Sequence, residues 1–309
     1  MQRVWITKVF PYIREVWPLL PAATYLLIFF IIVLLYLFGL SFSWGGQASA
    51  VVFPSLKPVN IVLQSRVFHE AIVNTFFFVL IGTPCELVTG LFLALILYRN
   101  FFMRNFIRSL FFIPLAVPAL VTAILLFILF DFPGGHINDL LLGKYGFMPG
   151  FIGTPFNWRG TKILALSLCM LGKVWRDMPI SMLILLAGMN SIDPQLFDVA
   201  KTMGAGFRAR FRHIILPLVI PSCATVLLLR SIEMWKEFIF PFVLAGKYSL
   251  LGTLIESLYN DWGASHEAAV VACVLVLCIA ITAFFFLKLM GTIKKHLIKS
   301  EQFRFYETS

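Results

Sequence analysis

Charged side chains occur inside long apolar stretches of this sequence, where they are unusual. A charged group at membrane depth costs about 2.5 to 3.5 kcal/mol on insertion scales, so such groups face a polar pathway, a partner or one another. Some can pair within one helix, because residues three, four or seven positions apart share a face. The set comprises Glu86, Lys173, Arg176, Asp177, Arg230, Glu233, Lys236 and Glu237.

Two interpretations of this set stay open. In the first, the charged groups line a water-filled cavity and contact the hydroxyl or charged groups of a polar solute, with Trp175 and Trp235 available to stack on its rings. In the second, opposite charges pair and simply hold helices together. The pairs expected in that case are Arg230 with Glu233, and Lys173 or Arg176 with Asp177 or Glu86.

A short helix is predicted in the stretch from Ser191 to Ser222, which links two of the apolar segments. Asp193 and Pro194 mark its start, since Asp caps free backbone N–H groups and Pro is tolerated at the first helical position. We expect the helix to run from Pro194 to Thr202 and the chain to turn at Gly204, which adopts positive φ readily. A helix of this length is not stable alone in water, so it requires a surface to pack on.

Catalytic and metal chemistry are not indicated. The five histidines and five cysteines are scattered without the spacing of metal ligands. The sequence has no G-x4-G-K-[ST] phosphate loop, and its loop carboxylates do not form a pair suited to acid–base catalysis. We therefore expect no enzymatic activity, no metal site and no cofactor.

The composition places these residues in a membrane. The chain is 60% hydrophobic and only 13% charged, whereas a soluble domain is about half apolar and a quarter charged. About 20 apolar residues cross a bilayer once, so 309 residues allow about six crossings. The predicted spans are Leu19–Phe42, Ala71–Leu97, Ser109–Phe130, Ile163–Gly188, Pro217–Ala245 and Ala268–Leu287.

The distribution of Lys and Arg predicts the orientation of the chain. The two termini and two of the connections between spans hold about fifteen of these residues, and the three connections on the other side hold about five. Cytoplasmic loops retain positive charge, so both termini and the loop 189–215 are predicted to be cytoplasmic. The basic stretch from Phe207 to His213 would then lie against lipid headgroups. The net charge of +10 is thus a topology signal, and a nucleic-acid partner is not expected.

The loop 189–215 and the start of the next span resemble a known family motif. The spacing E-A-A-x3-G-x9-I-x-L-P is matched in full by Asp198-Val199-Ala200, Gly204, Ile214 and Leu216-Pro217. That is the EAA loop of binding-protein-dependent ABC importer permeases; here Asp198 stands for Glu and Val199 for Ala. The stretches Arg108–Leu120 and Val174–Ile192 are similar to the carbohydrate-type permeases, which include the maltose and glycerol-3-phosphate transporter subunits.

The resemblance implies an all-α membrane protein of about six transmembrane helices with a MetI-like ABC importer permease core. It implies that the loop docks on an ATPase, with Asp198, Ala200 and Gly204 as docking residues. The implied partners are a second homologous permease subunit, two cytoplasmic ATPase subunits, an extracytoplasmic solute-binding protein and membrane lipid. The implied cargo is a sugar or related polar solute, and the implied location is the prokaryotic inner membrane.

The expected organisation has three parts. Residues 1–66 hold the N-terminal tail, the first span and an external loop, 67–290 form a permease core of five spans, and 291–309 form a cytoplasmic tail. The rival interpretation is a secondary transporter driven by an ion gradient, in which Glu86 and Asp177 would be proton or sodium sites. No convincing internal repeat supports that rival.

Overall fold

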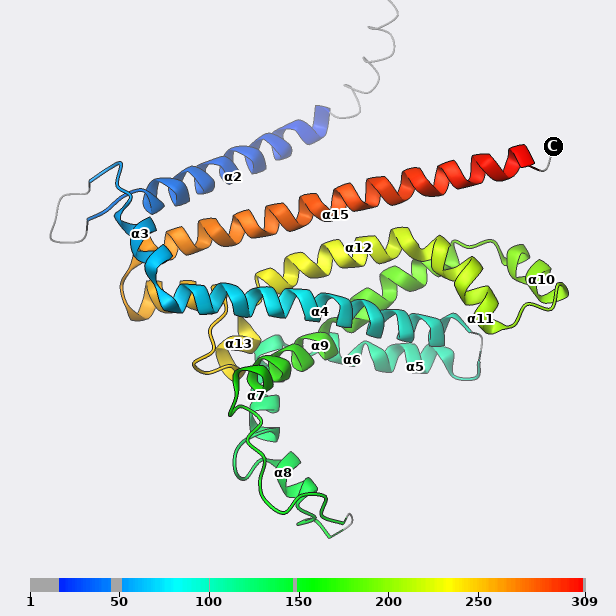
Figure 1. The fold of residues 1–309 in the computed structure, drawn as a ribbon, viewed down its shortest axis with the longest axis horizontal. Coiled ribbons are helices and arrows are strands. Elements are labelled where there is room, and N and C mark those ends of the chain that lie inside the picture. The colour runs from blue at the N-terminus through cyan, green and yellow to red at the C-terminus, as the bar shows by residue number, and fades with distance from the viewer. Residues whose placement is uncertain (1–16, 46–51, 100, 147–148, 308–309) are drawn as a thin grey trace, which may run out of the picture.

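The computed structural model describes residues 17–45, 52–99, 101–146 and 149–307, and these residues are mostly helical (Figure 1). The prediction of an all-α membrane fold is confirmed. The longer helices are α2 (Leu20–Ser41), α4 (Arg66–Tyr98), α7 (Ala119–Leu129), α9 (Lys162–Asn190), α12 (Leu216–Trp235) and α15 (Ser265–Glu307). The shorter ones are η1 (Trp17–Leu19), α3 (Lys57–Gln64), α5 (Arg104–Phe111), α6 (Ile113–Ala116), α8 (His136–Leu141), α10 (Pro194–Thr202), α11 (Phe207–Arg210), α13 (Ile239–Leu244) and α14 (Leu251–Glu256), with π-helical turns η2 (Phe211–Ile215) and η3 (Ser257–Asp261).

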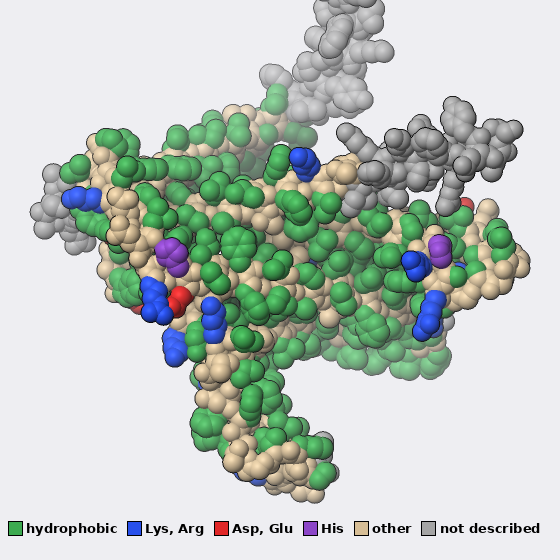
Figure 2. Space-filling model, in the orientation of Figure 1, with side chains coloured by type: hydrophobic (Ala, Val, Ile, Leu, Met, Phe, Trp, Pro, Cys, Tyr) green, Lys and Arg blue, Asp and Glu red, His purple; other side chains and the backbone are tan. Residues whose placement is uncertain are grey.

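Four stretches of the described chain are long and apolar enough to cross a membrane, and two bent helix pairs bring the total to as many as six. The four are α2, α4, the continuous path Phe207–Trp235 and the first part of α15. On the face shown in Figure 2, hydrophobic side chains cover the bundle along its length, and most Lys, Arg and His side chains lie toward its two ends. This distribution suits a bundle that crosses lipid along its long axis.

The third predicted span, Ser109–Phe130, is not one continuous helix. The segments Arg104–Ala116 and Ala119–Leu129 meet at 89°. The bend lies at Val117 and Pro118, where Val117 is extended with ψ 129°. A proline disfavours helical geometry in the residue before it and has no N–H for the helix ladder, so the chain turns here. From this bend, α7 and α8 leave the bundle (Figure 1).

The fifth predicted span, Pro217–Ala245, is also interrupted. Helix α12 ends at Trp235, and α13 begins at Ile239. Pro241 cannot donate a hydrogen bond to the carbonyl of Glu237, and its ring would clash with that carbonyl in a continuous helix. The side chain of Glu237 instead accepts a hydrogen bond from the backbone N–H of Phe240 at 3.2 Å. An ionisable group thus caps the start of the second half of a broken span.

Helices α4 and α9 form the centre of the bundle, and α12 packs on both. The backbones of α4 and α9 approach closely at Gly90, where an added Cβ would lie only 2.7 Å from the Cβ of Ser181. Small residues at such a crossing allow tight packing without large side chains between the helices. Helix α15 packs on α12 and α2, and α2 lies alongside it (Figure 1).

Candidate functional site

The loop between α9 and α12 contains the helix and the turn that its sequence predicts. Helix α10 covers Pro194–Thr202, as expected, and the Asp193 carboxylate accepts a hydrogen bond from the N–H of Gln195 at 2.9 Å. Gly204 has φ +75°, the left-handed conformation that glycine adopts without strain. The basic stretch after it is helical as α11 and η2, and it continues directly into α12.

One face of α10 is anchored and another is exposed. Phe197 packs into the core, with its ring centroid 5.9 Å from that of Tyr98 on α4. Leu196, Val199 and Met203, at spacing i, i+3 and i+7, are 46%, 57% and 81% exposed. Nothing in the described chain covers this apolar face. It is therefore available to another protein.

The remaining residues of the loop motif have distinct positions. The Asp198 carboxylate is exposed and pairs with Lys201 at 3.0 Å, and Ala200 is partly buried. Ile214 packs against the core cluster that holds Ile215 and Val219. Leu216 and Pro217 form the first turn of α12. The motif thus joins an exposed helix to a transmembrane span through a short connection.

The intramembrane charges that the sequence singled out come together where α4, α9 and α12 meet. We call this set the charge cluster. Its members are Glu86, Lys173, Arg176, Asp177, Arg230, Glu233 and Glu237. Lys236 is exposed and lies outside the cluster. Seven of the eight charges picked out from the sequence are therefore neighbours in space.

Most of the cluster is buried and internally paired. Lys173 Nζ lies 2.7 Å from Asp177 Oδ2 and 2.9 Å from Glu237 Oε2. Arg230 Nη1 lies 2.5 Å from Glu233 Oε2, and Arg230 Nε lies 3.5 Å from Glu86 Oε2. The pairs of Arg230 with Glu233, and of Lys173 and Arg176 with Asp177, are those expected from spacing. The contacts of Glu86 with Arg230 and of Lys173 with Glu237 join separate segments, and no local spacing signals them.

The charge cluster also connects the two broken spans. Arg176 Nη1 lies 2.6 Å from Asp177 Oδ1, and Arg176 Nε donates to the carbonyl oxygen of Val117 at 3.4 Å. Val117 is at the α6–α7 bend, and Glu237 is at the α12–α13 break. A chain of charged contacts through α9 therefore links both breaks, and the segments beyond them, α7 and α13, pack on each other.

Exposure separates the members that can meet a solute from those that cannot. The side chains of Arg176 and Glu233 are 25% and 34% exposed, while those of Glu86 and Asp177 are at most 4% exposed. Trp175 is 43% exposed. Trp235 is buried, and its Nε1 donates to Thr282 Oγ1 at 3.0 Å, so its ring is not open to stack on a solute in this conformation.

Comparison with known proteins gives the family. Residues 86–292 match the model for "Binding-protein-dependent transport system inner membrane component". The chain is 30% identical over 277 residues to the trehalose/maltose transport system permease protein MalF of Thermococcus litoralis, covering 85% of this chain and 90% of that one. It is 28% identical over 282 residues to the arabinooligosaccharides transport system permease protein AraP of Bacillus subtilis, covering 87% and 85%.

The fold agrees with solved transporters. A bacterial ABC transporter involved in the import of the acidic polysaccharide alginate contains a chain with a TM-score of 0.73 and 18% identity, covering 93% of this chain and 99% of that chain. A bacterial alginate ABC transporter in complex with an alginate pentasaccharide-bound periplasmic protein contains a chain with the same TM-score, 0.73, and the same identity, 18%. These comparisons lend no support to the ion-gradient alternative. The chain belongs to the family of binding-protein-dependent transport system inner membrane components.

Proposed function

We propose that this chain is the permease subunit of an ATP-driven importer for a sugar or a related polar solute. A separate solute-binding protein delivers the solute, and separate ATPase subunits hydrolyse ATP. The named relatives in trehalose/maltose and arabinooligosaccharide transport support a carbohydrate cargo. The chain pairs with a second homologous permease, and its termini and the loop 189–215 face the cytoplasm, in accord with the distribution of Lys and Arg.

The observation that carries this proposal is the uncovered apolar face of α10. Leu196, Val199 and Met203 project together from a helix anchored by Phe197 and ended by Gly204. Exposed apolar patches with polar surroundings mark protein contact sites. We infer that the ATPase covers this face. Asp198 lies on the groove side of α10, where it is paired with Lys201.

Co-purification with the cognate ATPase tests this assignment. Val199→Asp places a charge in the centre of the exposed face, and we expect it to abolish recovery of the ATPase with the affinity-tagged chain. Ala209→Asp is the matched control, since it adds the same charge to an exposed position of α11, in the same loop but outside that face. Wild-type recovery with Val199→Asp, or equal loss with both variants, contradicts the docking assignment.

Uptake into proteoliposomes tests the energy source and the cargo. The chain, its partner permease and the ATPase are reconstituted, and labelled maltose, trehalose or arabino-oligosaccharide is supplied with the binding protein. We expect uptake of one such sugar to require internal ATP and to persist when ionophores collapse the ion gradients. Uptake that ionophores abolish would instead favour a gradient-driven carrier.

Within the charge cluster, we propose a division of roles. The partly exposed Arg176 and Glu233 face the solute pathway, and the buried Glu86, Asp177 and Arg230 hold the spans together. Exposure supports this division, because a group without contact to water cannot meet a solute without rearrangement.

A further inference from the structure

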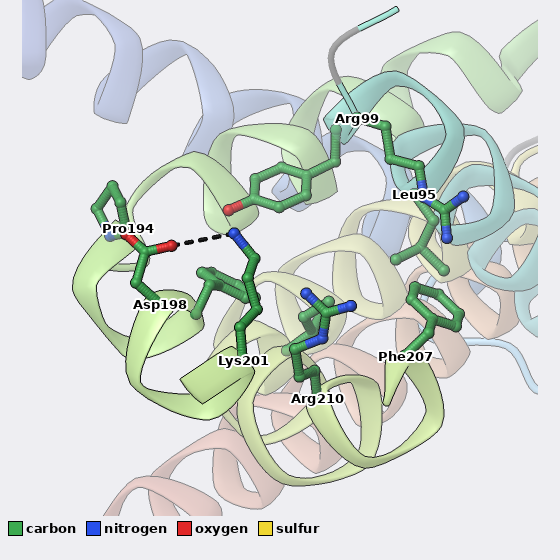
Figure 3. Close-up of a pocket in the computed structure, with 10 residues that line it drawn as sticks. Leu95, Arg99, Pro194, Asp198, Lys201, Phe207 and Arg210 are labelled. Atoms are coloured by element: carbon green, nitrogen blue, oxygen red, sulfur yellow. Dashed lines mark hydrogen bonds and ion pairs between the residues drawn. The ribbon is translucent and has the colours of Figure 1, made fainter. Parts of the chain in front are cut away.

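A groove lies between the end of α4, helix α10 and helix α11, on the side of α10 that faces the bundle (Figure 3). Its volume is about 420 Å³. Three cationic side chains line it, Arg99, Lys201 and Arg210, together with the carboxylate of Asp198. In Figure 3 the three cationic groups surround the open space, each from a different segment of the chain. The groove therefore has an excess of positive charge.

The single carboxylate does not neutralise this charge. Asp198 is paired with Lys201 at 3.0 Å. The guanidinium of Arg99 lies 4.8 Å from the ring centroid of Phe207 and forms no ion pair with any described residue. Arg210 Nε is buried without a hydrogen-bond partner in the described part of the chain. A buried donor without an acceptor is costly, so Arg210 favours an anionic ligand with several oxygen acceptors, and the exposed Arg99 can donate to the same ligand.

The position of the groove indicates which kind of anion it binds. It lies at the end of the membrane-spanning α4 and beside the start of α12, where these helices leave the apolar region. The groove is also walled by the apolar side chains of Leu95, Phe197 and Ile215. A phospholipid matches both features, since its phosphate is at this level of the bilayer and its glycerol and first methylene groups are apolar. Basic pockets between transmembrane helices are known recognition sites for anionic headgroups.

We propose that this groove binds the headgroup of an anionic phospholipid, with its phosphate between Arg99 and Arg210 and its acyl end against the apolar wall. The bound lipid contacts α4, α10 and α11 at once, and so fixes the helix-turn-helix relative to the bundle. The exposed face of α10 with Leu196 and Val199 stays free for another protein, because the groove is on a different side. The inference depends on the membrane location of the family and not on the identity of the solute.

Lipid retention in native mass spectrometry tests the proposal. The full-length chain is purified in detergent and equilibrated with equal amounts of phosphatidylglycerol and phosphatidylcholine that carry the same acyl chains. We expect selective retention of phosphatidylglycerol by the wild type. In Arg99→Gln/Arg210→Gln its retention should fall about tenfold, since each cation near the headgroup contributes severalfold to affinity. Retention of phosphatidylcholine should not change.

A matched double variant controls for net charge. Arg108→Gln/Arg212→Gln removes two exposed arginines from α5 and η2 that do not line the groove, and it should retain phosphatidylglycerol as the wild type does. Both double variants should elute as a single peak and unfold at the wild-type temperature in lipid-free detergent. Arg99→Lys/Arg210→Lys keeps the charge without the guanidinium fork and should show intermediate retention, which separates lipid contact from misfolding.

Three results would overturn the proposal. The first is equal retention of both lipids by the wild type, or equal loss in both double variants. The second is a rise in the unfolding temperature of the wild type when inorganic phosphate is added, with no such rise in Arg99→Gln/Arg210→Gln. That result would identify a site for a free anion. The third is unchanged lipid retention by that variant together with loss of ATPase co-purification, which would make the groove a protein contact.

Discussion

The charge cluster in the spans and the groove beside α10 use similar side chains in opposite ways. In the cluster, three basic and four acidic side chains come from three helices and a helix break, and each has an opposite charge within 4 Å. In the groove, two guanidinium groups have no acidic partner among the described residues. Charges that have an opposite charge nearby within the chain hold its helices together. Charges left unsatisfied at its surface are available to other molecules.

The largest effect is expected where this internal pairing is deepest. Arg230→Met leaves Glu86, which is 0% exposed, without the one cation that forms an ion pair with it in the described part of the chain. Breaking a buried pair from one side costs about 3 to 5 kcal/mol, because the remaining charge has no compensation. We expect the free energy of unfolding in mixed micelles to fall by that amount. Adding Glu86→Gln should recover much of it, and failure of this rescue would show that Arg230 does not act through Glu86.

A smaller loss is expected at the contact that joins α9 to the α12–α13 break. Lys173→Met removes the cation 2.9 Å from Glu237 Oε2, while Asp177 keeps Arg176 as a partner. Glu237 keeps the backbone N–H of Phe240 as a donor, whereas neither oxygen of Glu86 has a donor among the described residues, so we expect the smaller loss of one charged hydrogen bond, about 2 kcal/mol. Glu237→Gln should compensate, since the amide oxygen can still accept from the N–H of Phe240. A double-mutant cycle of unfolding free energies with no coupling between positions 173 and 237 would contradict the assignment.

The turn after α10 gives a test outside the spans. Gly204 has φ +75° and no atom within 4 Å of an added Cβ, so a substitution there acts on the backbone and not through a clash. Gly204→Val should destabilise the turn by about 1 to 2 kcal/mol. Gly204→Asn should cost less, because Asn tolerates this conformation. Hydrogen exchange of the α10 amides measures the destabilisation in each variant. Equal protection in Gly204→Val and Gly204→Asn would contradict the backbone explanation.

The smallest change in stability is expected at the partly exposed end of the cluster. Glu233 is 34% exposed, and ion pairs with access to water contribute at most about 1 kcal/mol. Glu233→Gln should therefore leave the unfolding free energy within about 1 kcal/mol of the wild type. If the side chain faces the solute pathway, the KM for uptake should change while ATPase association does not. An unchanged KM would restrict Glu233 to pairing with Arg230.

Local signals explain which parts of the molecule were predictable from its sequence. Helix α10 matches its predicted bounds because Asp193, Pro194 and Gly204 act through their own backbones and near neighbours. The apolar spans follow from composition in the same way. Pro118 and Pro241 are visible in the sequence, but mean hydropathy does not fall at a proline. Both spans were therefore predicted as continuous, although each is broken in the structure.

Contacts between helices were harder to predict from the sequence. The pair of Arg230 with Glu233 follows from a spacing of three residues. The contacts of Arg230 with Glu86 and of Lys173 with Glu237 depend on how α4, α9 and α12 are placed in space, and no spacing records that placement. The groove beside α10 was missed for the same reason, since Arg99 comes from a helix that precedes it by almost a hundred residues.

The close approach of α4 and α9 at Gly90 and Ser181 limits which parts of this protein can be displaced. Two helices in contact at backbone range cannot slide or rotate past one another without first separating, and separation would expose the apolar residues between them to water or lipid. We therefore expect α4 and α9 to move as one rigid body. Rearrangement during a transport cycle is then left to the breaks at Val117–Pro118 and Lys236–Phe238, and to helices α2 and α15, which pack on each other along one side of the bundle (Figure 1).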